Sequence, residues 1–187
     1  MVAMVGTDHH PFDRFVAWID AAAARHPEHR FLVQHGATRP PSLAEGVDFL
    51  PAAQLQQLMP TARVVICHGG PGSIMDARAA GHIPICVPRN PALGEHVDGH
   101  QLRFAEVVRD SGVVRLPSDE GDFRVMLADA LSVGLHDPVT WNSEAAGGTA
   151  RAAAILDDLM ITKPRRGGWR RGHQSSTLGN SFGRPPQ

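Results

Sequence analysis

The stretch "VVICHGGPGSIMDARAAGHIP", residues 64–84, decides the fold class. An apolar run ends at His68, and the next four residues are three glycines and a proline. Pro71 suits the first position of a helix, where its missing N–H costs nothing, and Gly81 suits the left-handed residue that follows one. The stretch therefore predicts a buried strand, a glycine loop and a helix over residues 71–80.

The rest of the chain repeats this alternation of strands and helices. Strands are expected at 2–6, 30–36, 47–51, 63–70, 82–89 and 112–116. Helices are expected at 11–26, 53–59, 94–112, 123–132 and 147–160. Continuous apolar strands that alternate with helices indicate a parallel sheet covered on both faces. The predicted fold class is α/β, with a Rossmann-like parallel sheet.

Charge divides the 187 residues into a body and a tail. Residues 1–162 hold 12 basic and 19 acidic residues, a net charge of −7, whereas residues 163–187 hold six basic residues and no acidic ones. An acidic body argues against nucleic-acid binding, which needs a basic face. The tail is rich in Arg, Gly, Ser and Pro, so we expect it to be disordered. The predicted organisation is one domain over 1–162 and a disordered basic tail over 163–187.

Cysteine usage and the N-terminus indicate a cytoplasmic protein. Cys67 and Cys86 are the two cysteines, and they do not form a CxxC pair. A secreted disulfide scaffold would carry more cysteines. The first ten residues lack a charged segment followed by an apolar one, and no apolar run approaches the roughly 20 residues that span a bilayer.

The glycine loop has the features of an anion site. In open α/β sheets, ligands bind at the carboxyl ends of the strands, where this loop lies. The first turn of the following helix has free N–H groups and a partial positive charge. Glycines let an anion approach the backbone. The candidate contacts are His68, Gly69, Gly70, Gly72, Ser73 and Asp76. The competing interpretation is a tight turn whose glycines serve packing. The loop is neither a P-loop, because the lysine is missing, nor a GxGxxG fingerprint.

The motif "HGGPGSIMD", residues 68–76, resembles the nucleotide-sugar motif of GT-B glycosyltransferases: a His, small residues, a Ser, two residues and an acid. Residues 1–160 as a whole resemble the C-terminal domain of glycosyltransferase family 28. Three further segments match this family in order: "VGT" (5–7), "DFLP" (48–51) and "DGHQ" (98–101). The resemblance implies a single GT-B C-terminal-type domain that binds a UDP-sugar.

The resemblance also assigns roles to residues of this chain. It implies that the backbone of Phe49 and Leu50 binds uracil, that Asp76 binds ribose and that His68 donates a hydrogen bond to a phosphate oxygen. It places the diphosphate on Gly69, Gly70, Gly72 and Ser73, and the sugar beside His100 and Gln101. Gly6 and Thr7 end the first strand at the same site.

The implied reaction is an inverting, metal-independent transfer of a hexose or N-acetylhexosamine from the UDP-sugar to a lipid-linked acceptor, in a cell-surface polysaccharide pathway. The UDP-sugar is a substrate, and no cofactor is expected. Complete GT-B enzymes have two such domains, so we expect a membrane-anchored partner subunit to bind the acceptor. This chain would then lie at the inner membrane face through that partner. The catalytic base is unassigned, with His68 and His10 as candidates.

Several alternatives remain open from the residues alone. The chain could be a non-catalytic nucleotide-sugar-binding module, or a fragment of a GT-B sugar-nucleotide epimerase. His96 and His100 are four residues apart, but they are not an HExxH motif, so no metal site is expected. His9 and His10 border the donor pocket or form a polar loop edge. Glu95 either contacts the sugar or favours the start of a helix.

Overall fold

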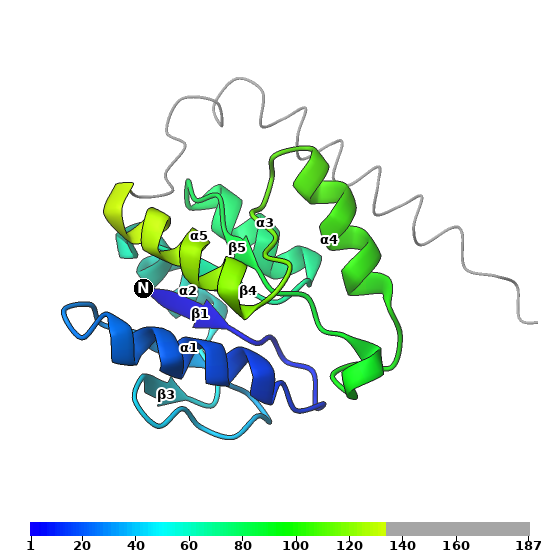
Figure 1. The fold of residues 1–187 in the computed structure, drawn as a ribbon, viewed down its shortest axis with the longest axis horizontal. Coiled ribbons are helices and arrows are strands. Elements are labelled where there is room, and N and C mark those ends of the chain that lie inside the picture. Colours follow the sequence, from blue (N-terminus) through cyan, green and yellow to red (C-terminus); the bar gives the residue numbers. More distant parts are fainter. Residues whose placement is uncertain (134–187) are drawn as a thin grey trace, which may run out of the picture.

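Five short parallel strands form one sheet in the order β3-β2-β1-β4-β5 (Figure 1). The computed structural model describes residues 1–133; the predicted helix 147–160 and the basic tail 163–187 lie outside the described residues. The strands are β1 (Val2–Met4), β2 (Leu32–Gln34), β3 (Glu45–Val47), β4 (Val65–Cys67) and β5 (Ile85–Cys86).

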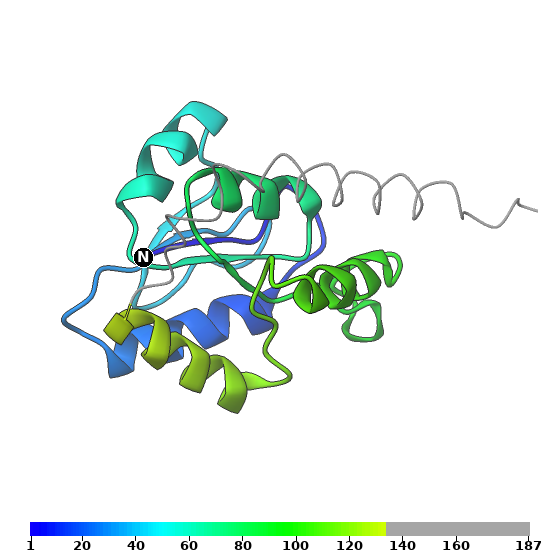
Figure 2. The same ribbon diagram turned by 90° about the horizontal axis from the view of Figure 1, so that it is seen from above.

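Helices cover both faces of this sheet, as the sequence predicts. On one face pack α1 (Asp13–Arg25) and α5 (Glu120–Val133), and on the other pack α2 (Ala52–Leu58), α3 (Pro71–Ala79) and α4 (His100–Asp110). Figure 2 shows α1 and α5 together on one side of the strands and α2 and α3 on the other. Two single 3₁₀ turns, η1 (Met59–Thr61) and η2 (Pro91–Leu93), complete the described elements.

Residue alternation along the strands builds the two halves of the core. In and just after β1, Ala3 and Val5 pack in the cluster beneath α1 and α5, whereas Val2 and Met4 pack in the cluster beneath α2, α3 and α4. Successive side chains of a strand point to opposite faces. Both sets are apolar because both faces are buried.

The ends of α3 follow local backbone chemistry. The helix begins at Pro71, and Gly81 follows its last turn with φ +85°. The Gly81 N–H donates to the Arg78 carbonyl at 2.9 Å, and the His82 N–H donates to the Ala77 carbonyl at 3.0 Å. The helix predicted over 71–80 is therefore confirmed to within one residue.

The expected sixth strand, 112–116, is wrong. The segment makes one isolated bridge, between Ile85 and Arg115. The Cys86 N–H donates to the Arg115 carbonyl at 2.8 Å, and the Arg115 N–H donates to the Pro84 carbonyl at 2.9 Å. Pro84 and Pro88 lie on either side of β5 and have no N–H, which keeps the ladder short.

Every observed strand is shorter than the predicted one, and two further differences in bounds affect the site. β3 ends at Val47, four residues before the predicted limit, because the chain turns there toward Pro51, which precedes α2. The helix predicted over 94–112 begins only at His100. Residues 94–99 form a loop instead, which Gly94 enters with φ +72°.

The strand order creates a switch point between β1 and β4. The chain proceeds from β1 outward through β2 to β3, then returns to the other side of β1 for β4 and β5. The loops after β1 and β4 therefore leave the sheet in opposite directions at its carboxyl edge. Such a divergence is where ligands bind in open α/β sheets.

Candidate functional site

Three loops meet at the carboxyl edge of the sheet. They are residues 5–12 after β1, residues 68–70 after β4 and residues 87–99 after β5. Arg89 in the third loop donates hydrogen bonds to carbonyls of the first, and the His68 ring of the second lies against Gly6, so the three loops form one site. Of the residues that the sequence singles out as the nucleotide-sugar site or as candidate bases, these loops hold Gly6, Thr7, His10, His68, Gly69 and Gly70.

The His68 ring lies against the backbone of two glycines. A Cβ at Gly6 would lie 2.5 Å from Cε1 of His68, and one at Gly70 would lie 2.2 Å from its Nε2. Gly6 also has φ +82°, a conformation that suits glycine. These two glycines are therefore required by the position of the imidazole, which the sequence did not indicate.

His68 is neutral near pH 7. Burial lowers its pKa to about 4, and the positive charge of Arg89 acts in the same direction. Its Nδ1 is buried and has no hydrogen-bond partner among residues 1–133. A neutral imidazole offers one donor and one acceptor, but with so low a pKa it is a weak base.

Packing explains Gly69 but not Gly72. A Cβ at Gly69 would lie 2.9 Å from the Cβ atoms of both Gln101 and Pro88. A Cβ at Gly72 would meet nothing within 4 Å, and this residue is exposed. The tight-turn interpretation thus accounts for the glycines at 69 and 70, whereas the space beside Gly72 is open.

The open space beside Gly72 lies at the first turn of α3. The first intrahelical bond runs from the Ile74 N–H to the Gly70 carbonyl at 3.3 Å, so the N–H groups of Gly72 and Ser73 precede it. No side chain caps this helix end. Asp76 is exposed one turn further along. A helix N-terminus with free donors favours an anion.

Arg89 is the main site residue that sequence reasoning missed. It is completely buried, and its guanidinium donates to the His10 carbonyl at 2.7 Å, the Glu95 carbonyl at 2.9 Å and the Val5 carbonyl at 3.0 Å. It also stacks 4.8 Å from the centre of the Phe12 ring. Burial lowers its pKa, and Asp8 and Glu95 oppose that effect. The one sign of this role in the sequence was the position of an arginine directly after an apolar run.

Glu95 holds the third loop to α1. Its carboxylate accepts two hydrogen bonds from Arg14, at 2.9 and 2.8 Å, and a third from the Asn90 N–H at 2.8 Å. The interpretation of Glu95 as a helix start is wrong, because α4 begins at His100. Its buried carboxylate is engaged by this network instead.

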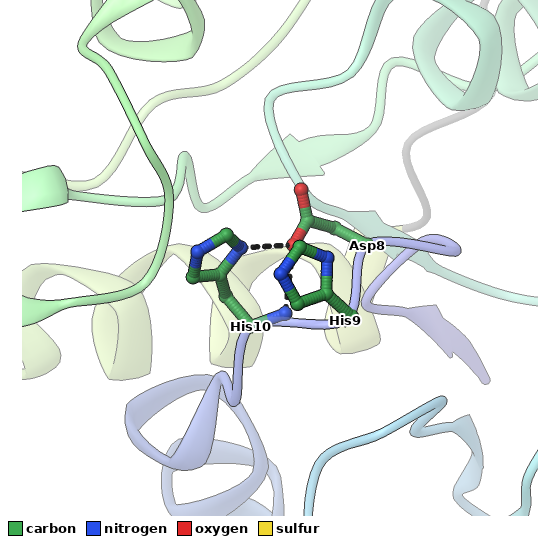
Figure 3. Close-up of side chains that lie close together, drawn as sticks. All are labelled: Asp8, His9 and His10. Carbon is green, nitrogen blue, oxygen red and sulfur yellow. Dashed lines mark hydrogen bonds and ion pairs between the residues drawn. The ribbon is translucent and has the colours of Figure 1, made fainter.

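Asp8 joins the first loop to the third. Its Oδ1 accepts from the His10 N–H at 2.7 Å and lies 2.6 Å from His10 Nδ1, as Figure 3 shows for the two side chains. Its Oδ2 lies 3.2 Å from His96 Nε2. Burial raises the pKa of Asp8, but the hydrogen bonds from His10 and the charges of Arg89 and His96 outweigh it and lower the pKa to about 2.

Two groups of side chains within residues 1–133 are spaced closely enough to hold a metal ion. They are Asp8, His9 and His10, and His96, Asp98 and His100, with ligand atoms within 4.8 Å in each group. Such donor atoms suit zinc. In each group the atoms also bind one another: His10 to Asp8, and His100 to Asp98 through both its backbone and its ring. Hydrogen bonds therefore hold the pairs His10–Asp8 and His100–Asp98, and the rings of His9 and His96 lie against these pairs.

The remaining candidates occupy different parts of this edge. Gln101 is buried, and its Oε1 accepts from the Arg89 N–H at 3.3 Å. His100 is exposed at the start of α4, with its ring 4.7 Å from that of His96. Thr7 is exposed after β1. The Phe49 and Leu50 segment follows β3, which two strands separate from β4. Phe49 is 62% exposed and Leu50 is buried.

These features define a Rossmann-like α/β domain with a candidate ligand site at its switch point. Residues 4–115 match the model of the glycosyltransferase family 28 C-terminal domain, and the chain belongs to this family. No curated protein matches the sequence. None of the helices within residues 1–133 has both the length and the apolar composition needed to cross a membrane.

A solved glycosyltransferase shares the fold. The crystal structure of the glycotransferase of kitacinnamycin aligns with a TM-score of 0.53 and 22% identity, over 84% of this chain and 43% of that one. The glycosyltransferase SnogD from Streptomyces nogalater aligns with a TM-score of 0.34 and 16% identity, over the same shares of the two chains. This chain therefore spans less than half the length of either structure.

Proposed function

We propose that this chain is the donor-binding and catalytic subunit of an inverting glycosyltransferase that uses a UDP-sugar. The observation that carries this proposal is the open space at Gly72, beside the uncapped first turn of α3. Packing accounts for the glycines at 69 and 70 but leaves that space without a role. A diphosphate fits it because the helix end supplies both donors and positive potential.

This site assists the reaction by stabilising the leaving group. An acceptor oxygen attacks the anomeric carbon, the bond from that carbon to the phosphate oxygen breaks, and UDP departs with the electron pair. The N–H groups of Gly72 and Ser73 stabilise the charge that develops. Neutral His68 donates one further hydrogen bond to a phosphate oxygen. These donors replace a metal ion at the diphosphate.

Other candidate residues complete the donor site in this proposal. Asp76 binds the ribose hydroxyls from the exposed side of α3, and the backbone of Phe49 and Leu50 binds uracil. His100 and Gln101 adjoin the hexose or N-acetylhexosamine, with Gly6 and Thr7 across the switch point. Support comes from the placement of most of these residues along the carboxyl edge of one parallel sheet.

The acceptor half comes from a second protein in this proposal. The physical ground is that a displacement needs the acceptor oxygen held close to the anomeric carbon, opposite the donor-binding edge. A membrane-anchored subunit would bind the lipid-linked acceptor and hold this chain at the inner face of the membrane, where cell-surface polysaccharides begin. A non-catalytic nucleotide-sugar-binding module would lack any turnover of the donor, which distinguishes the two functions.

Nucleotide selectivity tests the donor assignment. Calorimetric titration of the full chain with UDP and with ADP should give tighter binding of UDP, because the backbone at 49–50 is matched to uracil. Equal affinities would remove the uracil assignment. If neither nucleotide binds, the whole glycine loop is a tight turn whose glycines serve packing, and the proposed function is refuted.

A further inference from the structure

The two histidines that the sequence offers as bases differ in their surroundings. His68 is wedged between glycines, with a pKa of about 4, and is too weakly basic to take a proton efficiently at neutral pH. The His10 side chain is 24% exposed and contacts a carboxylate. Of these two histidines, only His10 is both accessible and in contact with an ionised carboxylate.

Asp8 fixes the His10 ring in one orientation. The same Asp8 oxygen contacts both the His10 N–H, at 2.7 Å, and its Nδ1, at 2.6 Å. Because Asp8 is ionised and can only accept, Nδ1 of His10 carries the proton, which leaves Nε2 with a free lone pair. In Figure 3 the second ring nitrogen of His10 faces away from the Asp8 carboxylate.

Arg89 and His96 hold the Asp8–His10 pair in place. Arg89 donates to the His10 carbonyl at 2.7 Å, which fixes the backbone of this residue. His96 lies against the second oxygen of Asp8, so both carboxylate oxygens have partners. The ionisable groups around the His10 ring are Asp8, His9 with its ring 4.1 Å away, His96 with its ring 6.0 Å away, and Arg89. Such support keeps a reacting group in position before substrate arrives.

Position in the fold relates this pair to the leaving group. Asp8 and His10 follow β1, and the first turn of α3 follows the glycine loop after β4. These two strands are hydrogen-bonded neighbours, so their loops leave the switch point about one strand spacing apart, roughly 5 Å at the sheet. A sugar whose diphosphate lies on α3 would therefore have the Asp8–His10 pair on the other side of the switch point.

We propose that His10 is the general base of the transfer and that Asp8 is its positioning residue. This inference rests on the proposed function. Nε2 of His10 takes the hydroxyl proton as the acceptor oxygen bonds to the anomeric carbon, while the bond to the phosphate oxygen breaks and its electron pair leaves with UDP. Asp8 stabilises the imidazolium across Nδ1. The proton then passes to solvent through the exposed side of the ring.

The proposal has a consequence for the chain by itself. Base and leaving-group site both belong to this chain, so water can replace the acceptor hydroxyl. The full chain should hydrolyse UDP-glucose or UDP-N-acetylglucosamine slowly without any partner. Release of UDP, followed by a coupled assay, measures this reaction. Hydrolysis should fall about 100-fold in His10→Gln, as expected for loss of a general base.

Controls separate catalysis from folding and binding. His10→Gln should bind UDP as tightly as the unchanged chain in calorimetry. His29→Gln is the matched control, because His29 is also a histidine beside a carboxylate, 3.5 Å from Glu28, and lies outside the site. It should hydrolyse the donor at the normal rate.

Asp8→Asn tests the positioning role through the separation of kcat from KM. Loss of the carboxylate partner of Nδ1 should lower kcat for donor hydrolysis while KM changes little, because the donor-binding residues stay in place. Asp8→Glu, which keeps a carboxylate acceptor, should restore part of the lost kcat. An unchanged kcat in Asp8→Asn would overturn the role of Asp8.

The outcomes distinguish this inference from the proposed function. Normal hydrolysis in His10→Gln would overturn the assignment of the base and leave the donor site intact. UDP binding by the unchanged chain without any hydrolysis of either donor would also overturn it. Absence of UDP binding would refute the proposed function itself.

Discussion

At the residue scale, burial keeps the His68 imidazole neutral at acid pH values where a solvent-exposed histidine would carry a charge. Its unperturbed pKa would be about 6.5, and burial lowers it to about 4. A charged imidazolium would lack solvation there and would face Arg89. The folded chain therefore keeps the imidazole neutral over a pH range in which the unfolded chain protonates it.

This difference predicts a pH dependence of stability. Because the folded pKa of His68 is depressed, its contribution is present above about pH 6.5 and is lost as the pH falls toward 4. The free energy of unfolding should decrease by about 2 kcal/mol from this group between pH 7.5 and pH 5. His68→Gln should flatten the curve by that amount in urea unfolding at both pH values. A pH dependence in His68→Gln as steep as in the unchanged chain would contradict the assignment.

Asp76 gives a second prediction at this scale. Asp76→Ala should leave the fold unchanged, because this side chain is on an exposed position of α3. Loss of a charge-assisted hydrogen bond to ribose should weaken UDP binding by roughly 1–3 kcal/mol in calorimetry. Glu106→Ala removes an equally exposed acid from α4 and serves as the control. Normal UDP binding by Asp76→Ala would show that ribose lies elsewhere.

At the scale of elements, the glycine loop and α3 divide into a packed part and an open part. Gly70 is in contact with the His68 ring, and Gly72 has free space around it. Packing requires a glycine at the first of these positions, and in the proposed function the second leaves room for the phosphates. Only the packing role concerns stability.

A pair of alanine variants separates these purposes. Gly72→Ala should keep or raise the free energy of unfolding, by up to about 1 kcal/mol, because alanine favours a helix. It should weaken UDP binding at least about tenfold, because the methyl group enters the space that the phosphates need. Gly70→Ala should destabilise the fold, because its Cβ would lie 2.2 Å from Nε2 of His68. Thermal unfolding and calorimetry measure both effects, and normal UDP binding by Gly72→Ala would move the diphosphate away from α3.

At the scale of the whole molecule, the proposed function gives this chain one wall of a cleft. A displacement needs donor, acceptor and base within near-contact distance, which demands a second wall. We expect the isolated chain to bind UDP and hydrolyse the donor but to transfer no sugar to a lipid-linked acceptor. Transfer should appear on co-expression with the membrane-anchored partner, measured as labelled sugar in the lipid fraction. Robust transfer by the isolated chain would refute the need for a partner.

Chelation tests how the charge of the leaving group is stabilised. If the N-terminus of α3 and His68 act on the diphosphate, donor hydrolysis should persist in excess EDTA. The sharpest contrary result would be a complete loss of hydrolysis that manganese or zinc restores. That result would assign the two histidine–aspartate groups to a metal and would displace His10 as a base.

The sequence by itself determined the fold class, the position of the glycine loop and the family. These features depend on local patterns: apolar runs of strand length, a proline at a helix start and a glycine after its end. Each pattern extends over a few neighbouring residues, so it is legible without knowledge of the fold. The helix at 71–80 is predicted to within one residue for this reason, and the matched region, residues 4–115, contains all four motifs of the resemblance.

Only the tertiary structure decided how the site residues act on one another. Arg89 donates hydrogen bonds to the backbone carbonyls of Val5 and His10, and Glu95 pairs with Arg14, across 79 or more positions of sequence. The neutral state of His68 and the ionised state of Asp8 follow from these contacts and from burial. No local pattern encodes them, because a parallel sheet brings together loops that are distant in the chain. The charge of a buried group depends on all the neighbours that such a fold assembles around it.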